Sequence, residues 1–264
     1  MNRKLIDTHS HIYEPEFDED RDEVISRALE SGLEYLIFPA IDPKSNPKMF
    51  SCAEKNPSFM KCMMGLHPTS VCENWKEDLF ETYCTLKNVP MSLSPISGIG
   101  EIGLDLYWSK DFIKEQEEVF RTQLDWAVEM GKPVSIHTRS AWEEMKTVLK
   151  DYRHRGLFGI MHAFSSTVDD FKEISGYGDF YFGIGGVVTF KKSPLAQVVR
   201  EIPLERIVLE TDCPYLTPVP MRGKRNESSY LTYICDTVAQ IKEITSEQVA
   251  DTTTKTAKKI FSII

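Results

Sequence analysis

The segment Leu5-Ile6-Asp7-Thr8-His9-Ser10-His11 leads from two apolar residues into a pair of histidines one residue apart. In a β-strand alternate side chains point to the same face, so a strand here sets His9 and His11 side by side. Two imidazoles at a strand end can hold one metal ion if other ligands converge on it. An isolated His-x-His pair is more often a solvated loop pair, so the assignment depends on the rest of the chain.

Seven further β-rich runs follow, separated by stretches with helical character. The predicted strands are 4–9, 35–41, 61–66, 96–102, 133–137, 158–161, 180–184 and 206–210, and the predicted helices include 21–31, 115–130, 141–152, 167–175, 195–202, 228–243 and 246–261. Eight strands that each precede a helix predict an α/β protein with a (β/α)8 TIM barrel, and a doubly wound open sheet is the alternative. Because no Pro- or Ser-rich linker divides the chain, residues 1–264 are expected to form one domain.

The composition is that of an ordinary globular protein. The 264 residues are 41% hydrophobic and 27% charged, and no apolar run approaches the roughly 20 residues of a membrane span. The absence of a secretory signal pattern and of CxxC pairs among the six cysteines predicts a cytoplasmic protein with free thiols and no membrane partner. The net charge of −9 argues against non-specific coating of nucleic acid, but a bound metal can still supply a local positive field.

Residue types that bind metals gather where the predicted strands end, which in a barrel is the rim that carries the chemistry. The histidines at or just past a strand end are His9, His11, His67, His137 and His162. Two carboxylates join them, Glu101 at the end of the fourth strand and Asp212 just past the eighth. Each residue alone could be a hydrogen-bonded loop residue or a helix cap. Their joint placement on one rim favours a metal centre.

Alternation along the last strand separates two roles for its carboxylates. Val208, Glu210 and Asp212 share one face, so the acidic pair is expected to point into the barrel. Glu210 lies one step deeper and is suited to orient a histidine ligand from behind. The whole set exceeds the needs of one tetrahedral ion and fits two divalent ions bridged by Glu101, an arrangement that suits phosphoester hydrolysis. Mg, Mn and Zn all remain candidates.

Six motifs, in order along the chain, resemble the TatD-like metal-dependent hydrolases, a branch of the amidohydrolase superfamily. They are Asp7-Thr8-His9-Ser10-His11, Gly65-Leu66-His67-Pro68, Gly100-Glu101-Ile102-Gly103-Leu104-Asp105, Ile136-His137-Thr138-Arg139, His162-Ala163-Phe164-Ser165 and Glu210-Thr211-Asp212-Cys213-Pro214-Tyr215. The resemblance implies a (β/α)8 barrel of the metal-dependent hydrolase type. It also implies a deoxyribonuclease with 3′–5′ exonuclease action, which cleaves phosphodiester bonds with metal-activated water.

The resemblance further implies a role for each residue on the rim. The residues that would hold one metal are His9, His11, Glu101 and Asp212, and those that would hold the second are Glu101, His137 and His162. His67 would lie near the substrate phosphate or a metal-bound water. Asp212 would also accept the proton of the attacking water, so Asp212 and Glu101 are the predicted catalytic residues.

Basic residues on the same rim are candidates for binding a substrate phosphate. Arg139 lies just past His137, and the irregular loop after the last strand carries Arg222, Lys224 and Arg225. A solvated charged loop is the alternative explanation for the last three.

The segment Leu106-Tyr107-Trp108 departs from the Tyr and basic residue that the family tends to carry there. Its aromatic side chains, with Phe164, either stack on a base or form the wall of the site. DNA, bound at its ends by a monomeric protein, is the expected partner. The alternatives are a metal-dependent hydrolase of a carboxylic ester or amide, such as a small metabolite or an aminoacyl-tRNA, and a non-catalytic metal-stabilised binding protein.

Overall fold

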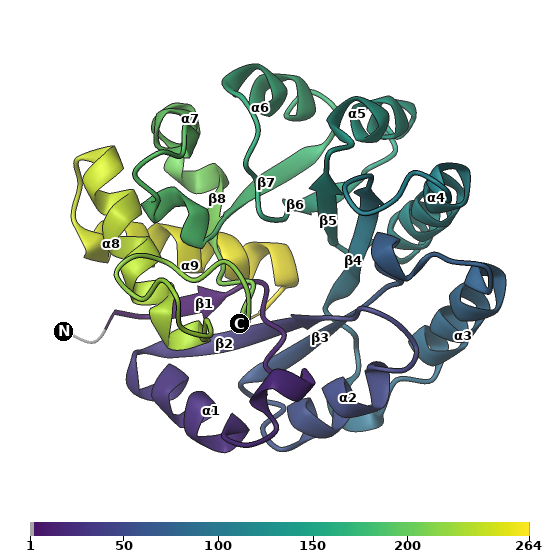
Figure 1. The fold of residues 1–264 in the computed structure, drawn as a ribbon, viewed down its shortest axis with the longest axis horizontal. Coiled ribbons are helices and arrows are strands. Elements are labelled where there is room, and N and C mark those ends of the chain that lie inside the picture. The colour runs from purple at the N-terminus through teal and green to yellow at the C-terminus, as the bar shows by residue number, and fades with distance from the viewer. Residues whose placement is uncertain (1–2, 264) are drawn as a thin grey trace.

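A computed structural model describes residues 3–263 as a barrel of parallel strands surrounded by helices (Figure 1). The strands are β1 (Leu5–Asp7), β2 (Leu33–Pro39), β3 (Met60–Met64), β4 (Gly98–Asp105), β5 (Val134–Arg139), β6 (Phe158–Met161), β7 (Asp179–Ile184) and β8 (Ile207–Leu209). They lie in one sheet in the order of the sequence, and every pairing is parallel. The predicted (β/α)8 barrel is confirmed.

The helices follow the strands in alternation. They are α1 (Arg21–Glu30), α2 (Asn46–Glu54), α3 (Trp75–Lys87), α4 (Ile113–Met130), α5 (Trp142–Asp151), α6 (Val168–Ile174), α7 (Leu195–Glu201), α8 (Leu231–Lys242) and α9 (Ser246–Phe261). As predicted, α4 ends before a glycine: Gly131 has a left-handed backbone (φ 59°) that a residue without Cβ adopts at no steric cost. No helix within residues 3–263 is long and apolar enough to cross a membrane.

The barrel closes where β1 meets the end of β8. The Thr8 N–H donates to the Leu209 carbonyl at 3.1 Å, and beyond the strands the Asp212 N–H donates to the His9 carbonyl at 2.9 Å. Ser10 and Cys213 continue this seam as an isolated parallel bridge. The seam therefore brings the first and last motifs of the chain together.

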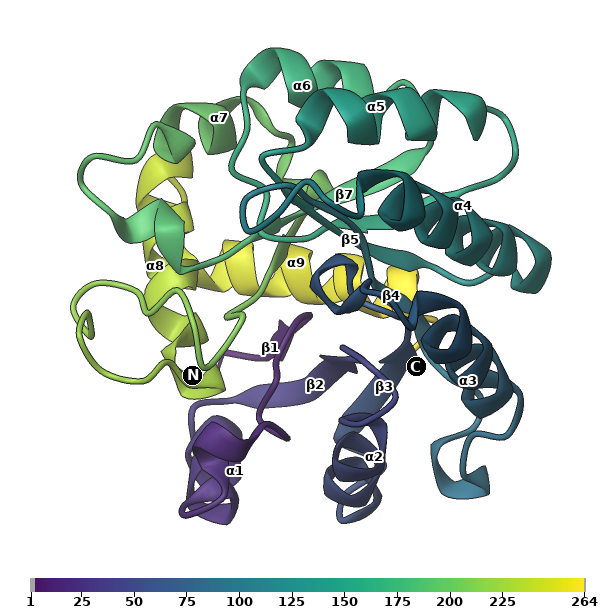
Figure 2. The same ribbon diagram turned by 45° about the vertical axis from the view of Figure 1, so that its right-hand side comes forward.

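The amino end of the barrel is filled by apolar side chains. Its interior cluster consists of Ile6, Ile37, Met63, Ile160, Tyr181 and Val208 from the strands, with Ala257, Ile260 and Phe261 from α9. Figure 2 shows α9 running across the barrel beside β1, away from the ring formed by the other helices. The amino end is thus closed, and a polar site is left for the carboxyl end.

Strand β8 is shorter than the predicted span 206–210. Pairing ends at Leu209, and Asp212 has a left-handed backbone with φ 56°. The alternation expected for Val208, Glu210 and Asp212 therefore does not set the direction of the Asp212 side chain. A turn held by the seam does so instead.

Candidate metal centre

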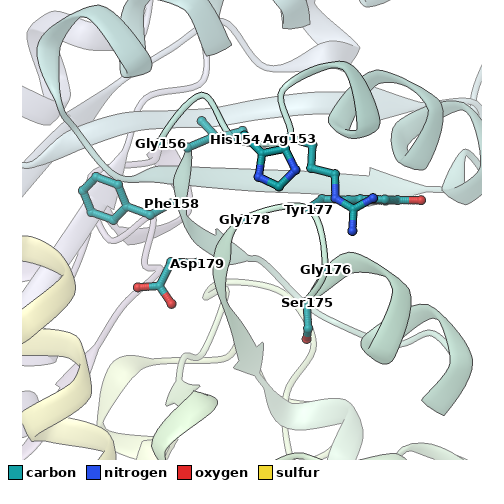
Figure 3. Close-up of a pocket in the computed structure, with 10 residues that line it drawn as sticks. Arg153, His154, Gly156, Phe158, Ser175, Gly176, Tyr177, Gly178 and Asp179 are labelled. Carbon is teal, nitrogen blue, oxygen red and sulfur yellow. The ribbon is translucent and has the colours of Figure 1, made fainter.

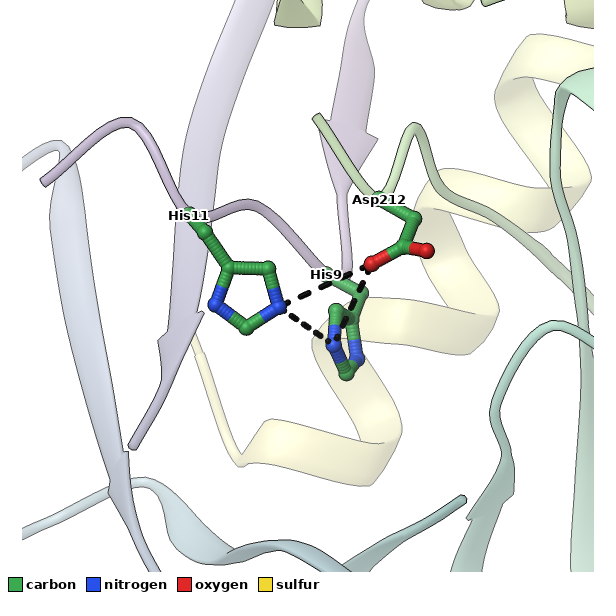
Figure 4. Close-up of side chains that lie close together, drawn as sticks. All are labelled: His9, His11 and Asp212. Carbon is green, nitrogen blue, oxygen red and sulfur yellow. Dashed lines mark hydrogen bonds and ion pairs between the residues drawn. The ribbon is translucent and has the colours of Figure 1, made fainter. Parts of the chain in front are cut away.

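His9, His11 and Asp212 point toward one another across the seam (Figure 4). The Nε2 atoms of the two histidines lie 3.1 Å apart. Oδ1 of Asp212 lies 3.6 Å from Nε2 of His11 and 3.9 Å from Nε2 of His9. Two ring nitrogens and one carboxylate oxygen thus face a common point.

The Glu101 carboxylate divides its oxygens between two groups of imidazoles. Oε2 lies 3.0 Å from Nε2 of His9 and 3.6 Å from Nε2 of His11. Oε1 lies 2.9 Å from Nδ1 of His137 and 3.3 Å from Nε2 of His67. Glu101 therefore lies between the two groups, in the position of a bridging ligand.

Local backbone geometry aims Glu101 inward. The register of β4 against β5 shifts between Ile99 and Ile102, which redirects the intervening side chain as a bulge does. The Glu101 N–H donates to the carbonyl of Ala40, just past β2, at 3.0 Å. Gly100 permits this close approach, because a Cβ there would lie only 2.7 Å from Cβ of Ser135.

His162 faces both carboxylates of the centre. Its Nε2 lies 3.6 Å from Oδ1 of Asp212 and 3.7 Å from Oε1 of Glu101. Its ring stacks on that of His9 with centroids 3.4 Å apart, whereas the His137 centroid is 6.4 Å away. The structure thus brings the His162 ring closer to His9 of the first group than to His137 of the second, with which the family resemblance had associated it.

Each imidazole is held from behind by a second side chain. The partners are Ser135 for His9 (3.2 Å), Tyr13 for His11 (2.9 Å), Thr69 for His67 (2.6 Å), Asp105 for His137 (2.9 Å) and Glu210 for His162 (3.0 Å). Such partners orient metal-binding imidazoles and select their tautomers. Of these five, the sequence predicted only Glu210. Asp105 could have been found as the last residue of a strand-end motif, but Ser135 and Tyr13 carry no sequence signal.

The partners also decide which ring nitrogen has a free lone pair. The Tyr13 hydroxyl donates to the Pro39 carbonyl, so it accepts from Nδ1–H of His11 and leaves Nε2 of that ring free. The carboxylate of Asp105 accepts from Nε2–H of His137, which leaves Nδ1 free toward Glu101. Free lone pairs directed at two carboxylates fit a divalent metal.

His67 has the opposite arrangement. The Thr69 backbone N–H donates to Nδ1 of His67 at 3.2 Å, so in the neutral ring the proton lies on Nε2. Burial lowers the pKa of His67, against the charge of Glu101, and keeps the ring neutral. His67 therefore directs an N–H donor toward Glu101 and the pocket, although its position alone would also suit a ligand.

The carboxylates create a field that favours cations. Desolvation opposes protonation of His11 and His162, but Asp212, Glu101 and Glu210 outweigh it and raise the pKa of His11 to about 9 and that of His162 to about 10. A divalent ion bound to the same nitrogens would replace these protons.

Asp7 and Asn226 fasten the loop that carries Asp212. The Asp7 carboxylate accepts the Thr211 backbone N–H at 2.9 Å and the Thr211 hydroxyl at 2.6 Å. Asn226 donates from Nδ2 to the carbonyls of Thr211 at 2.8 Å and Tyr215 at 2.6 Å. Burial raises the pKa of Asp7 to about 7 despite these bonds. Asp7 lies inside the opening motif, yet the sequence assigned it no role.

A pocket of about 680 Å³ opens above the centre. Its lining includes the imidazoles of His11, His67, His137 and His162 with Glu101 and Asp212, and at its mouth Trp108, Arg139 and Tyr215. Arg139 is the only Arg or Lys in that lining, among the residues that the structure describes. Pockets of this volume accommodate small molecules or parts of larger substrates.

The other predicted phosphate-binding residues do not line the pocket. Nη2 of Arg225 pairs with Oδ2 of Asp20 at 2.6 Å. The guanidinium of Arg222 lies 4.3 Å from the Phe190 ring centroid. Lys224 lies in the same loop, outside the pocket lining.

A second pocket, of about 520 Å³, lies at the opposite end of β6 and β7 (Figure 3). It contains Arg153 and the exposed His154, the histidine for which the sequence predicted a surface position. Asp179, also in its lining, pairs with Arg206. The metal-ligand groups found within residues 3–263 all lie at the carboxyl end.

A barrel that gathers imidazoles and carboxylates at its strand ends belongs to the class of metal-dependent hydrolases. Residues 6–262 match the family model of TatD related DNase, and the chain belongs to this family.

Curated relatives cover nearly the whole chain. The uncharacterized metal-dependent hydrolase YabD of Bacillus subtilis is 38% identical, over 98% of this chain and 99% of its own. The 3′–5′ ssDNA/RNA exonuclease TatD of Erwinia tasmaniensis is 28% identical, over 98% of this chain and 100% of its own. Among solved structures, the TatD homologue YJJV of Escherichia coli K12 superposes with a TM-score of 0.91 at 23% identity, with full coverage of both chains.

Proposed function

We propose that this protein is a metal-dependent 3′–5′ exonuclease that shortens single-stranded DNA by cleaving phosphodiester bonds. The observation that carries the proposal is the Glu101 carboxylate, whose two oxygens face separate imidazole groups beside Asp212. Two ions that share one carboxylate suit in-line displacement at phosphorus. The relative TatD of Erwinia tasmaniensis, a 3′–5′ ssDNA/RNA exonuclease, supports the same substrate class.

The proposed ligands are imidazoles that face the carboxylates of Glu101 and Asp212, assigned to two ions as the family resemblance implies. His9, His11, Glu101 and Asp212 would hold one divalent ion, and Glu101 with His137 and His162 would hold a second. Bound there, such ions polarise a phosphoryl oxygen and lower the pKa of a water molecule toward neutrality.

Asp212 is the proposed acceptor for the proton of the attacking water. Its side chain is 16% exposed, so it reaches the pocket while its backbone is fixed by the seam. Desolvation works to raise the pKa of Asp212, but the charge of His162 and the nearby His11 outweigh it and lower the pKa below its ordinary value. Asp212 is therefore ionised at neutral pH and able to accept a proton.

His67 and Arg139 are proposed to bind the phosphate. Neutral His67 lines the pocket and carries an N–H at Nε2, 3.3 Å from Oε1 of Glu101, which could donate to a phosphoryl oxygen. The guanidinium of Arg139 lines the mouth and can donate two parallel hydrogen bonds to a phosphate. Neither side chain needs to change protonation for this role.

The test uses single-stranded DNA labelled at its 5′ end, with Mg²⁺ or Mn²⁺. The purified protein should produce a ladder of labelled products that shorten from the 3′ end, and a chelator should stop the reaction. Asp212→Ala and Glu101→Gln should abolish it, whereas Asp179→Asn, which removes a carboxylate at the other end of the barrel, should not. A protein that leaves DNA intact but cleaves an ester or amide with the same metals would overturn the proposal.

A further inference from the structure

We propose that Trp108, held by Tyr107 and Arg139, is a stacking platform for the unpaired terminal base of the substrate. The inference rests on the proposed function and deepens it, because it names a base-bearing single-stranded end as the ligand. The three side chains come from the segment after β4 and from the last residue of β5.

The platform has a defined geometry. The guanidinium carbon of Arg139 lies 3.7 Å from the ring centroid of Tyr107 and 5.4 Å from that of Trp108. The two aromatic rings meet edge to face with centroids 5.0 Å apart. Leu106, the residue before Tyr107, donates its backbone N–H to the Arg139 carbonyl at 2.9 Å. The cluster is therefore held by both strands and is not a solitary surface ring.

The rings of Tyr107 and Trp108 are too exposed to be part of the hydrophobic core. Trp108 is 72% exposed and Tyr107 is 55% exposed, although both are large apolar side chains. A single exposed aromatic residue is unremarkable in a folded protein. Trp108, however, lines the same pocket as Glu101 and His137, so its free face is presented to whatever occupies that pocket. Exposed aromatic faces beside a phosphate site are the feature that binds unstacked bases.

Asp105 couples the platform to the candidate metal centre. One of its carboxylate oxygens accepts the Tyr107 backbone N–H at 3.0 Å, and the other lies 2.9 Å from Nε2 of His137. The aromatic turn and a proposed metal ligand thus share one rigid support. For a nucleotide whose phosphate lies beside His137, Trp108 is part of the lining of the same pocket and is available to the base.

Arg139 supplies the charge that this end of the pocket needs. Within residues 3–263 its side chain has no acidic partner, in a chain whose net charge is −9. Its planar face packs on Tyr107, which leaves the N–H donors at its edge free for a phosphate. The same cluster therefore offers an aromatic face to a base and hydrogen-bond donors to the backbone that carries it.

The platform selects for single strands. A base can lie on Trp108 only after it has left its own stack and pair, which an unpaired end allows and a duplex end resists. Duplex ends should consequently be poorer substrates than single-stranded ends of the same sequence.

The first experiment compares two single-stranded oligonucleotides that differ only in whether the 3′-terminal nucleotide carries a base or is abasic. Wild-type protein should prefer the base-bearing end by about 5- to 150-fold in kcat/KM, the range that one stacked base provides. Trp108→Ala should reduce the preference nearly to one, mainly through KM, and Trp108→Phe should retain most of it. The control is Phe80→Ala, which removes a similarly exposed aromatic ring (69%) on α3, outside the lining of this pocket. It should behave as wild type.

The second experiment separates the platform from the proposed activity. Calorimetric titration measures the affinities for 2′-deoxyadenosine 5′-monophosphate and for 2-deoxyribose 5-phosphate, which lacks the base. Tighter binding of the nucleotide by wild type, lost in Trp108→Ala, supports the platform even if DNA is not cleaved. Equal affinities, or a preference unchanged in Trp108→Ala, overturn the platform, while DNA cleavage by wild type would still uphold the proposed function.

Discussion

At the amino end of the strands the barrel interior is apolar, whereas at the carboxyl end the same strands surround imidazoles and carboxylates. Ile6 and Val208 pack against α9 at the first end, and His9 and Glu210 lie only two or three residues away, just past the ends of β1 and β8. Burial of apolar area stabilises the fold at about 25 cal/mol per Å². Burial of charged groups costs free energy unless they are paired or bind a metal.

The amino end of the barrel therefore contributes mainly to stability, and the carboxyl end carries the residues suited to chemistry. The amino end is closed by α9 and, within residues 3–263, holds none of the groups of side chains that could bind a metal. The carboxyl end keeps buried polar groups in place through second side chains such as Ser135 and Asp105. Substitutions at the two ends should therefore change different measurable quantities.

The largest expected effect is on activity at the carboxyl end. Asp212→Ala should lower kcat/KM on single-stranded DNA by about 10²–10⁴-fold, since the variant has no proton acceptor. Its free energy of unfolding should change by less than about 1 kcal/mol, because the side chain is partly exposed and packs no apolar core. Nuclease assays measure kcat/KM and urea denaturation measures the free energy of unfolding. A large loss of stability alongside the loss of activity would show that the carboxyl end also determines stability.

Next in size is a loss of stability at the amino end. Phe261→Ala should lower the free energy of unfolding by about 3–5 kcal/mol, because it leaves a cavity in the cluster between α9 and the strands. The folded fraction should keep its kcat/KM. Phe80→Ala serves as the control and should change stability by about 0.5 kcal/mol at most. Loss of metal-dependent activity in folded Phe261→Ala would show that the two ends are coupled.

Metal binding should stabilise the carboxyl end independently of the amino end. Mn²⁺ at 100 times its dissociation constant should raise the free energy of unfolding by about 2.7 kcal/mol. Phe261→Ala should gain the same increment, since distant sites are additive, and Glu101→Gln should gain much less. Thermal unfolding with chelator and with metal measures the increments, and unequal gains in wild type and Phe261→Ala would count against independence.

The smallest effect should come from a pair outside both ends, between α5 and α6. Nζ of Lys146 lies 2.8 Å from Oδ1 of Asp170. Desolvation opposes ionisation, but the bonds from Lys146, Ser166 and Thr167 lower the pKa of Asp170 from 3.8 to about 2. At neutral pH Lys146→Met should cost about 1–2 kcal/mol, because the side chains of this pair are only 10% and 15% exposed and the change leaves Asp170 without its cation.

The pH dependence of that cost has a definite sign. A carboxyl group whose pKa is lowered in the folded state, such as Asp170, contributes its full stabilisation above pH 3.8. This stabilisation is lost as the pH falls through about 2. The free energies of unfolding of wild type and Lys146→Met, measured as the pH is lowered, should therefore converge in this range. A difference that grows toward low pH would contradict the assignment.

Much of the barrel was predictable because the periodicity of apolar residues is local. The predicted helix 246–261 coincides with α9, and the predicted strand 158–161 coincides with β6. The bounds of α2 and α3 were not predicted. The predicted β8 was too long because its pairing stops where the seam with β1 takes over, and the partners in that contact, Thr8 and Leu209, are 201 residues apart in sequence.

In the candidate site, too, local sequence patterns were predictable and contacts between distant residues were not. The histidines, Glu101 and Asp212 were identifiable because metal-binding residue types recur at strand ends, a pattern visible along the chain. The partner of His9, Ser135, is 126 residues away, so only the register of the sheet reveals it. The loop arginine Arg225 had the right charge for a phosphate, but Asp20, 205 residues away, holds it outside the pocket.

The sequence by itself determined the barrel and the residue types of the rim, because both arise from short-range patterns of apolar and polar side chains. The tertiary structure decided how the rim is arranged: which oxygen of Glu101 faces which imidazole, why His67 presents an N–H donor, and that Arg139 and Trp108 share the mouth. These features depend on distances between strands that are far apart in sequence. Only the closed sheet sets those distances.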